Sequence, residues 1–576
     1  MPELWSCGSA TSLRGLCSRG WTKWGRRQNN ENQHGKEAGH VNLADLLRRG
    51  THAAVFACLA AAATAQSGLP EPAELSLFDQ AIAEIAAEDP VLGAFYRDNG
   101  YNALWTDDTL EDRERLEAFV TALADAGHHA LPVVRFRPEA LRSILADADS
   151  DRERGSAEAE ISRLYLAYAD ALQSGILSPQ QIDGIKREAP RRDHAELLND
   201  IANRDPRKVL RALAPQSPEY TRLMRAKMEL ERLIDSGGWG EAAADVRLDP
   251  GERGDEVVAL RARLARMGYG DDTGSDLFDP ALEEAVLAFQ ADHGLLEDGI
   301  AGPNTLEQIN RSPQERMGQV VVAMERERWL NFDRGERHVW VNLADFTASI
   351  IDDGKVTFQT RSVVGATALD RRSPEFSDEM EHLVVNPTWH VPRSIAVNEY
   401  MPDFKRNPYA HGQLEIHYKG EAIARERINW HLVTASNFPF ALKQPPSRSN
   451  ALGLVKFMFP NRWNIYLHDT PAKDLFNRTT RAFSHGCIRL QEPFEFAYEL
   501  LSRQSDDPEA LFQSRLAQGV ESVLPLEQPV PVHLVYRTVI TTPKGGLEYW
   551  PDIYGRDAAI LAALLEAGVE IGARQS

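Results

Sequence analysis

Basic residues are in deficit in this sequence. The chain has 64 Lys and Arg against 85 Asp and Glu, a formal net charge of -21 over 576 residues. An acid excess of this size argues against nucleic acid or an anionic membrane surface as the main partner, because both repel negative charge. At roughly 100–200 residues per domain, the length suggests about three domains.

Long apolar runs are also lacking near the N-terminus, where residues 53–63 form a run too short to span a bilayer. Arg48-Arg49 precedes this run and Ala63-Thr64-Ala65 follows it. A positive region, a short apolar core and an A-x-A end are the parts of a secretory signal peptide. We therefore expect residues 1–65 to be an N-terminal extension and signal peptide on an exported chain; a buried Ala-rich helix is the alternative. Because the prefix is long for a signal, we expect translation to begin near Val41.

Cysteine is scarce, with four residues in the whole chain. Cys7, Cys17 and Cys58 lie in the segment that signal cleavage would remove, which leaves Cys487 with no partner for a disulfide. A lone cysteine in an exported protein is an intermolecular link, a reactive thiol or an inert buried residue. The surroundings of Cys487 have to decide between these.

Residues 74–245 place apolar side chains three and four positions apart, which predicts a helical domain. The last of these patterns stops at Gly237-Gly238, a helix-ending signal. Paired catalytic groups are lacking in this region. His128 and His129 are adjacent and have no further ligand residues nearby, which is more typical of surface polar residues than of a metal site.

Residues 248–310 predict a compact unit of three helices. The second helix has Asp279 as its N-cap and Pro280 at its first position. The segment "AVLAFQADHGLLEDGIAGPNTLEQIN" resembles a peptidoglycan-binding domain of the three-helix kind, in the pair Phe289-Gln290 and in Asp298-Gly299. Peptidoglycan as the ligand is what this resemblance implies; the helical pattern alone indicates a small bundle with a polar loop.

From residue 337 the period changes from helical to alternating. The stretch at 337–365 is β-branched, with a turn at Asp352-Asp353-Gly354, and predicts a hairpin. A late hairpin is expected around Gly545-Gly546, followed by a helix. We expect residues 337–560 to be mainly β, with a loop-rich insertion at about 400–450 that could act as a binding lid. The predicted fold class is thus multidomain α + β, with a helical scaffold, a three-helix domain and a mainly-β domain.

The candidate catalytic residues lie in and near "FSHGCIRLQEP", which contains Cys487 between a Ser-His-Gly loop and a short strand. A cysteine attacks carbonyls as its thiolate, so it needs a base or a positive field. His468, at the end of an expected strand, is a candidate base. Gly486 allows backbone conformations in which the N–H groups of Gly486 and Cys487 converge as an oxyanion hole. His485 is a second candidate imidazole.

Arg489 shares the alternation face of Cys487. It could lower the pKa of the thiol, hold a substrate carboxylate or form a structural ion pair.

These motifs resemble the active-site signature of the L,D-transpeptidase (YkuD-type) catalytic domain: a histidine, about 15 residues, then Ser/Thr-His-Gly-Cys-x-Arg/Asn. Further matching segments are "VNLADF" at 341–346, "VVG" at 363–365, "NPTWHVPRSIA" at 386–396, "NALGLVKFMFPN" at 450–461 and "WPDIYGRD" at 550–557. With the helical region and the peptidoglycan-binding unit, the chain resembles the large periplasmic L,D-transpeptidases of Gram-negative bacteria. A departure is Ser373-Pro374, where the family usually has a Lys/Thr-Pro arrangement.

The resemblance implies a role for each site residue. Cys487 is the nucleophile, and it attacks the carbonyl that links meso-diaminopimelate to D-Ala in a tetrapeptide stem of peptidoglycan. His468 is the general base and then the acid, oriented by the backbone carbonyl of Asp469. His485 and Gly486 help to form the oxyanion site, and Arg489 completes the motif. The thioester then passes to an amine of another stem and gives a 3→3 cross-link, with neither cofactor nor metal.

Three alternatives stay open at this point. His468, His485 and Cys487 are of the right residue types for a zinc site, although a His-x-Cys pair on a strand rarely leaves an open position. The same thioester could go to water, which would give an L,D-carboxypeptidase or a cross-link hydrolase. A non-catalytic wall-binding protein is the third, and the intact pair of His468 and Cys487 speaks against it.

Overall fold

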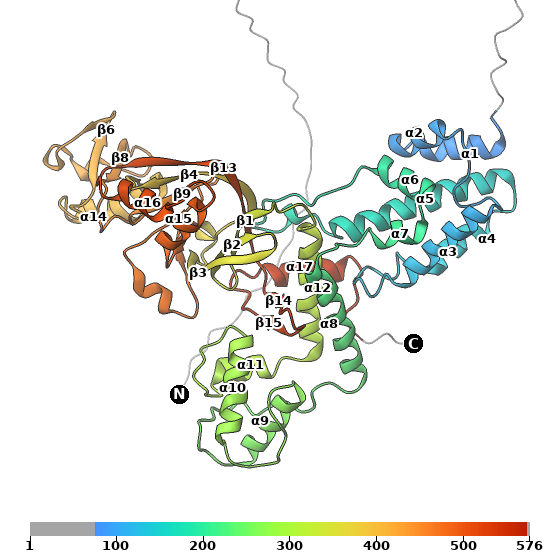
Figure 1. The fold of residues 1–576 in the computed structure, drawn as a ribbon, viewed down its shortest axis with the longest axis horizontal. Helices are drawn as coiled ribbons and strands as arrows, with labels where there is room; N and C mark the ends of the chain where they lie inside the picture. The colour runs from blue at the N-terminus through green and yellow to red at the C-terminus, as the bar shows by residue number, and fades with distance from the viewer. Residues whose placement is uncertain (1–74, 573–576) are drawn as a thin grey trace, which may run out of the picture. The chain divides into compact units, whose positions relative to one another are not determined.

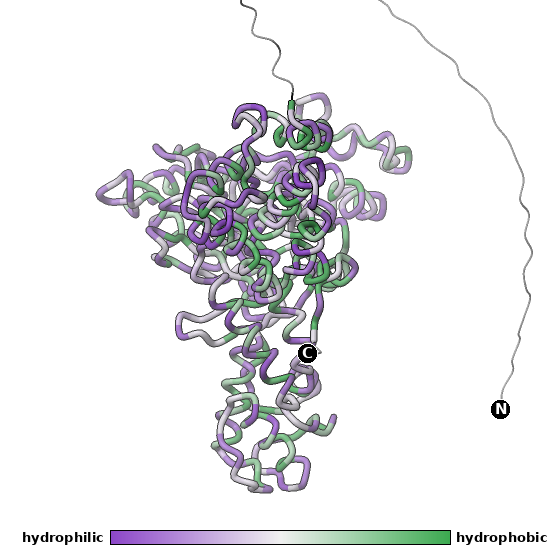
Figure 2. Tube along the Cα trace, turned by 90° about the vertical axis from the view of Figure 1, so that its right-hand side faces the viewer, coloured by the Kyte–Doolittle hydropathy of each residue, from purple (hydrophilic) through white to green (hydrophobic). Residues whose placement is uncertain are grey.

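The computed structural model describes residues 75–572 (Figure 1). The expected signal peptide, with Cys7, Cys17 and Cys58, lies outside the described residues. Within them, no helix is long and apolar enough to cross a membrane, and Figure 2 shows hydrophobic and hydrophilic stretches alternating along the trace.

The first part of the described chain is helical, as predicted. Its helices are α1 (Leu77–Ala86), α2 (Pro90–Asp98), α3 (Leu110–Ala124), α4 (Pro138–Ala146), α5 (Asp151–Ser174), α6 (His194–Asn203), α7 (Pro206–Arg211) and α8 (Pro218–Asp235). The aromatic loop between α2 and α3 is fixed by the buried carboxylate of Glu158, which accepts hydrogen bonds from the backbone N–H groups of Leu104 and Trp105. The Trp105 ring packs at 5.6 Å from that of Phe119. A core of aromatic rings therefore holds these helices together.

The second part contains α9 (Asp255–Arg266), α10 (Pro280–Asp292) and α11 (Pro303–Ile309). Asp279 caps α10 by accepting from the N–H of Leu282, as the sequence predicted. The Gln290 side chain accepts from the N–H groups of Asp298 and Gly299 and donates to Thr305. The motif residues in this turn therefore have a structural task, which is to close the turn onto α10.

Helix α12 (Pro313–Trp329) joins this unit to the β-rich part and was not assigned from the sequence. Its end, "MERERW", has the composition of an exposed helix, yet it is buried. These charges are paired: Arg328 pairs with Glu325 at 2.6 Å, Arg326 pairs with Glu375 and Asp557, each at 2.8 Å, and Glu327 pairs with Arg537 at 3.1 Å. Composition alone wrongly suggests exposure of this segment, because ion pairing makes burial of these charges tolerable.

The β-rich part is built on strands that close into a barrel. They are β1 (Arg337–Asn342), β2 (Thr347–Asp352), β3 (Lys355–Gly365), β4 (Phe376–Val385), β9 (Val455–Met458), β10 (Leu467–His468), β11 (Ala482–Ser484), β12 (Ile488–Leu490) and β13 (Ser522–Val535). Their order is β11-β3-β12-β10-β9-β4-β13-β1-β2, and pairing of β2 with β3 closes the ring. The turn between β2 and β3 has positive φ at Asp353 and Gly354, which suits the twist of a hairpin.

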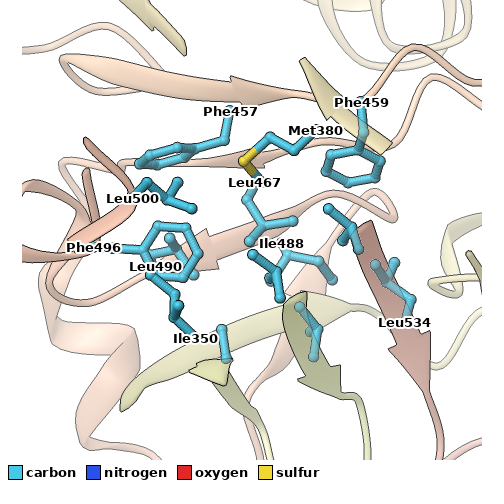
Figure 3. Packing of buried hydrophobic residues seen from close by; sticks show 14 of the residues in the cluster. Ile350, Met380, Phe457, Phe459, Leu467, Ile488, Leu490, Phe496, Leu500 and Leu534 are labelled. Carbon is cyan, nitrogen blue, oxygen red and sulfur yellow. The ribbon is translucent and has the colours of Figure 1, made fainter. Parts of the chain in front are cut away.

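The interior of this barrel is apolar, and Figure 3 shows its packed side chains. Leu467, Ile488 and Leu490 point into the core, beside Met380 and Phe496. Because side chains alternate along a strand, the neighbours of these three residues face the other side of the sheet. Burial of one face of β10 and β12 thus directs the other face outward, where the site lies.

Two helices, α15 (Pro493–Leu501) and α16 (Pro508–Leu516), pack on the barrel. The second hairpin, with β14 (Val539–Thr541) and β15 (Leu547–Tyr549), and the last helix, α17 (Arg556–Glu566), pack in a separate core with α8 and α12. The late hairpin and the last helix agree with the sequence-based prediction. Helix α17 packs on α12.

The insertion at about 400–450 is more ordered than the loop-rich segment we expected. It contains α14 (Met401–Arg406) and contributes to a small sheet of order β5-β8-β6-β7, with strands β5 (Trp389–His390), β6 (Glu415–Tyr418), β7 (Glu421–Ala422) and β8 (Phe440–Gln444). Phe404 stacks on Trp430 with ring centroids 4.6 Å apart. The aromatic residues are too widely spaced in the sequence to show a period, which is why this core escaped prediction.

Candidate active site

The site is built on two neighbouring parallel strands. On β10, His468 is the register partner of Arg489 on β12. Cys487 immediately precedes β12 and is half-buried. The core residues Leu467 and Ile488 fix both strands from inside the barrel. The sequence-predicted His468, Cys487 and Arg489 therefore lie together, and all three line one cavity.

The His468 ring is buried and oriented by the backbone. Its Nδ1 lies in hydrogen-bond contact with the carbonyl oxygen of Asp469. A carbonyl can only accept, so Nδ1 carries the hydrogen and Nε2 is the basic nitrogen. Burial, together with the charge of Arg489, lowers the pKa of His468 to about 3, although the carbonyls of Asp469 and Leu452 act in the opposite direction. The imidazole is therefore neutral at neutral pH.

Asp469 is held from several sides. Its carboxylate accepts from the N–H of Leu454 at 2.9 Å, from the N–H of Thr470 at 2.7 Å and from Lys473 at 2.9 Å. These bonds fix the backbone carbonyl that orients His468.

Cys487 has a neutral thiol in this environment. Burial raises the pKa of the Cys487 thiol to about 11, while hydrogen bonding by Tyr466 and the charge of Arg489 act in the opposite direction. The sulfur also lies 3.5 Å from the carbonyl oxygen of Asn464. Such a thiol needs a base to remove its proton when it reacts.

Arg489 influences both members of the pair. Its charge favours the thiolate of Cys487 and disfavours the imidazolium of His468. Burial lowers the pKa of Arg489 itself, and its Nε has no hydrogen-bond partner among residues 75–572. Arg489 thus supplies an uncompensated positive field beside the sulfur.

The predicted oxyanion donor at Gly486 needs a correction. Gly486 has a φ of 113°, as expected for a glycine-dependent loop, but its N–H donates to Ser484 Oγ at 3.0 Å. The Ser484 hydroxyl in turn donates to the Cys487 carbonyl at 2.5 Å. The Gly486 N–H is therefore engaged within the loop. The Cys487 N–H has no acceptor among the described residues, which makes it the remaining candidate donor for an oxyanion.

His485, which the sequence suggested as an oxyanion residue or second imidazole, lines the same cavity as Cys487 and His468 and is paired with an acidic side chain. Its Nε2 lies 2.5 Å from the carboxylate of Glu399. Because this ring nitrogen is engaged by Glu399, the pairing also argues against His485 as a zinc ligand. Within residues 75–572, no three His, Cys, Asp or Glu side chains gather closely enough to hold one metal ion.

Ser373, at the departure from the family pattern, supports the cysteine loop. It is fully buried; its hydroxyl donates to the Gly486 carbonyl at 2.7 Å and accepts from the Gly365 N–H at 2.9 Å. Ser373 therefore braces the loop from beneath.

A cavity of about 760 Å³ opens over these residues. The lining residues that the sequence analysis did not assign to the site include Arg371, Glu399, Lys456 and Tyr466. Tyr466 had a usable signal, since it shares the alternation face of His468. Arg371 and Glu399 are far from the motif in sequence and had none.

Three family descriptions match the chain. Residues 336–514 match the L,D-transpeptidase catalytic domain, residues 90–226 match a scaffold domain, and residues 253–309 match a "Putative peptidoglycan binding domain". Both the predicted family and the predicted fold class are thereby confirmed.

Among known proteins, a Haemophilus influenzae protein named "Putative L,D-transpeptidase" is 30% identical over 242 residues, which is 42% of this chain and 48% of that protein. The chain thus spans about half the length of this curated relative.

Among solved structures, an L,D-transpeptidase from Stackebrandtia nassauensis is 16% identical, covering 51% of this chain and 95% of that one, with a TM-score of 0.20. Another, from Xylanimonas cellulosilytica, is 14% identical, covering 51% of this chain and 100% of that one, with a TM-score of 0.14. From its three matched segments, the chain combines a YkuD-type L,D-transpeptidase catalytic domain with a scaffold domain and a peptidoglycan-binding domain.

Proposed function

We propose that this protein is a peptidoglycan L,D-transpeptidase that uses Cys487 as its nucleophile and acts in the periplasm. The observation that carries the proposal is the position of His468 on β10 and of Cys487 just before the adjacent β12, both lining one large cavity, with the imidazole oriented by the Asp469 carbonyl. The substrate is a tetrapeptide stem, and the peptidoglycan-binding unit would hold the wall nearby.

The first half-reaction forms a thioester. His468 Nε2 takes the proton of the Cys487 thiol as the sulfur bonds to the carbonyl carbon between diaminopimelate and D-Ala. The pair starts neutral, so charge separates only as the reaction proceeds. The Asp469 and Leu452 carbonyls favour the imidazolium as it forms, and Arg489 favours the anionic sulfur.

The tetrahedral intermediate needs a donor for its oxyanion. The Cys487 N–H is the candidate, because it is adjacent to the nucleophile and free among the described residues. The Gly486 N–H could join only if its bond to Ser484 Oγ opens. When the intermediate collapses, the C–N bond breaks, and the imidazolium returns its proton to the amine of the departing D-Ala.

The second half-reaction transfers the acyl group. An amine of another stem attacks the thioester carbonyl and gives a proton to His468. The C–S bond then breaks, and the sulfur recovers that proton as the thiol. The product is a 3→3 cross-link. If water attacks instead, the enzyme is an L,D-carboxypeptidase or a cross-link hydrolase with the same first step.

Product analysis tests this proposal. The protein is incubated with disaccharide-tetrapeptide fragments, and products are separated and weighed by mass spectrometry. A dimer with one D-Ala lost, absent with Cys487→Ala, is the expected result. The variant Cys487→Ala should fold normally, since it removes a single sulfur atom with its contacts to Tyr466 and to the Asn464 carbonyl.

The other outcomes are distinct. If tripeptide monomer is the sole product, the enzyme is a hydrolase and not a transferase. Unchanged fragments, together with an intact fold and an alkylatable Cys487, would defeat the proposal. As a matched control, Ser514→Ala changes an exposed serine outside the cavity and should leave the products unchanged.

A further inference from the structure

Three side chains from separate segments meet on the wall of the Cys487 cavity. The Arg371 guanidinium lies 2.9 Å from Oε1 of Glu399, and Nε2 of His485 lies 2.5 Å from the same oxygen. All three residues line the cavity that also holds Cys487. Two donors therefore converge on a single carboxylate oxygen, and one of them, His485, is two positions from Cys487 in the sequence.

The two donors belong to the rigid side of the cavity. His485 is part of the cysteine loop. The backbone at 371–373 packs against that loop, because a Cβ built on Gly486 would lie 3.8 Å from the Arg372 carbonyl oxygen and 3.9 Å from that of Arg371. Ser373 then bonds to the Gly486 carbonyl. The backbone of Arg371 is thus fixed with respect to Cys487.

Glu399 comes from the opposite side. It lies in a π-helical turn, Ala396–Tyr400, between the short helix Arg393–Ile395 and α14. Such turns are rare and frequently mark functional sites. The core of the insertion, around Phe404 and Trp430, is separate from the barrel core. Glu399 is therefore the member of the trio that the insertion brings in.

The contact among the trio is accessible to solvent. The side chains of Arg371, Glu399 and His485 are 37%, 35% and 33% exposed. Ion pairs of this exposure contribute little stability, because water solvates the separated charges well. A carboxylate from solution could therefore replace Glu399 at small cost, keeping the same two donors.

The charges of the cavity favour an anionic ligand. Its lining includes Arg371, Lys456 and Arg489 as cations, against Asp370 and Glu399 as anions, in a chain of formal charge -21. If the Glu399 side chain moves out of the cavity, the excess of positive over negative charge in the cavity lining increases.

We propose that Arg371 and His485 form a carboxylate subsite for the donor stem, and that Glu399 occupies this subsite until a carboxylate of the substrate displaces it. This rests on the proposed function, since the stem peptide is the ligand. The terminal carboxylate of D-Ala and the free carboxylate of diaminopimelate are the two sources of the same chemistry. Arg371 is then a specificity-determining residue.

Binding without turnover tests the subsite. The full chain with Cys487→Ala is titrated calorimetrically with four tetrapeptides: the free acid, the D-Ala carboxamide, the diaminopimelate carboxamide and the fully amidated peptide. One carboxamide should bind about ten-fold more weakly than the acid, through loss of charge-assisted hydrogen bonds. That peptide identifies the carboxylate.

Further variants, made in the Cys487→Ala chain, test which side chains recognise the carboxylate. Arg371→Gln should weaken the acid about ten-fold and abolish its advantage over the sensitive carboxamide, while Arg371→Lys should restore part of it. Glu399→Gln should tighten the acid several-fold, because the internal competitor loses its charge. Arg372→Gln is the matched control: it removes the same charge at the adjacent residue, which does not line the cavity, and should change nothing.

The outcomes separate the two proposals. Equal binding of all four peptides, or an unchanged acid preference in Arg371→Gln, overturns the subsite. With Cys487 restored, Glu399→Gln should lower KM for the acid. A loss of kcat with unchanged KM would give Glu399 a purely structural role and overturn the competitor role. Absence of any product from the unmodified enzyme would instead defeat the proposed transpeptidase reaction, whatever the binding data show.

Discussion

His468 and Arg489 face each other across β10 and β12 as register partners, so a permanent cation stands beside the candidate base. Arg489 disfavours protonation of the imidazole and favours ionisation of the thiol. The first effect keeps His468 neutral until the reaction begins, and the second stabilises the sulfur anion as it forms. The site is thus poised for proton transfer during attack and holds no preformed thiolate–imidazolium pair.

The titration of Cys487 should reflect this arrangement. Because burial raises the thiol pKa to about 11, alkylation by iodoacetamide should keep rising from pH 8 to pH 10. Arg489→Met should shift the curve to still higher pH, and Arg489→Lys should restore part of the effect. The rate is read by mass spectrometry on the peptide that contains Cys487. A plateau below pH 8 in the unmodified protein would contradict the buried neutral thiol.

His468 should make the fold sensitive to acid. The pKa of His468 is lowered to about 3 in the folded chain, against about 6.5 when unfolded, so the native state binds fewer protons. Its contribution is complete above pH 6.5 and is lost as pH falls toward 3, by ~1.4 kcal/mol per unit. Urea unfolding of His468→Gln should therefore show a shallower decline over this window. His431→Gln, at an exposed histidine, should retain the full decline.

Gly453 should be needed for activity although it lies outside the catalytic pair. Its φ is 62°, and a Cβ there would lie 2.2 Å from Oδ2 of Asp469. Gly453→Ala should displace Asp469 and with it the carbonyl that orients His468. We expect kcat to fall about 100-fold, as is usual for small misplacements of catalytic groups, with little change in KM. Gly412→Ala, where a Cβ meets nothing within 4 Å, is the control; equal kcat in both variants would refute this link.

Gln290 should be required by the peptidoglycan-binding unit but not by the chemistry. Gln290→Ala leaves the buried N–H of Gly299 and the hydroxyl of Thr305 without a partner. Each orphaned group costs about 1–3 kcal/mol, so the unit should lose stability and retention on insoluble peptidoglycan. Turnover of soluble fragments should persist. Glu297→Ala, in the exposed part of the same loop, should behave like the unmodified protein; loss of soluble turnover in Gln290→Ala would contradict this separation.

The parts of the fold that could be predicted are those encoded by neighbours in sequence. Asp279 caps a helix because its side chain reaches an N–H three residues away, and Asp353-Gly354 turns a hairpin because both tolerate positive φ. The insertion and α12 could not be predicted in the same way. Phe404 contacts Trp430, which is 26 positions further along the chain, and the charges of α12 find partners elsewhere in the chain.

The sequence by itself determined the family, the fold class, and the candidates Cys487, His468 and Asp469, because a motif fixes residue types at fixed spacing along two adjoining strands. Tertiary structure alone decided how their surroundings are used. It engaged the Gly486 N–H with Ser484, placed Ser373 beneath the loop, and brought Glu399 to His485 from 86 residues away. Such contacts depend on packing of the barrel against the insertion, which no local pattern encodes.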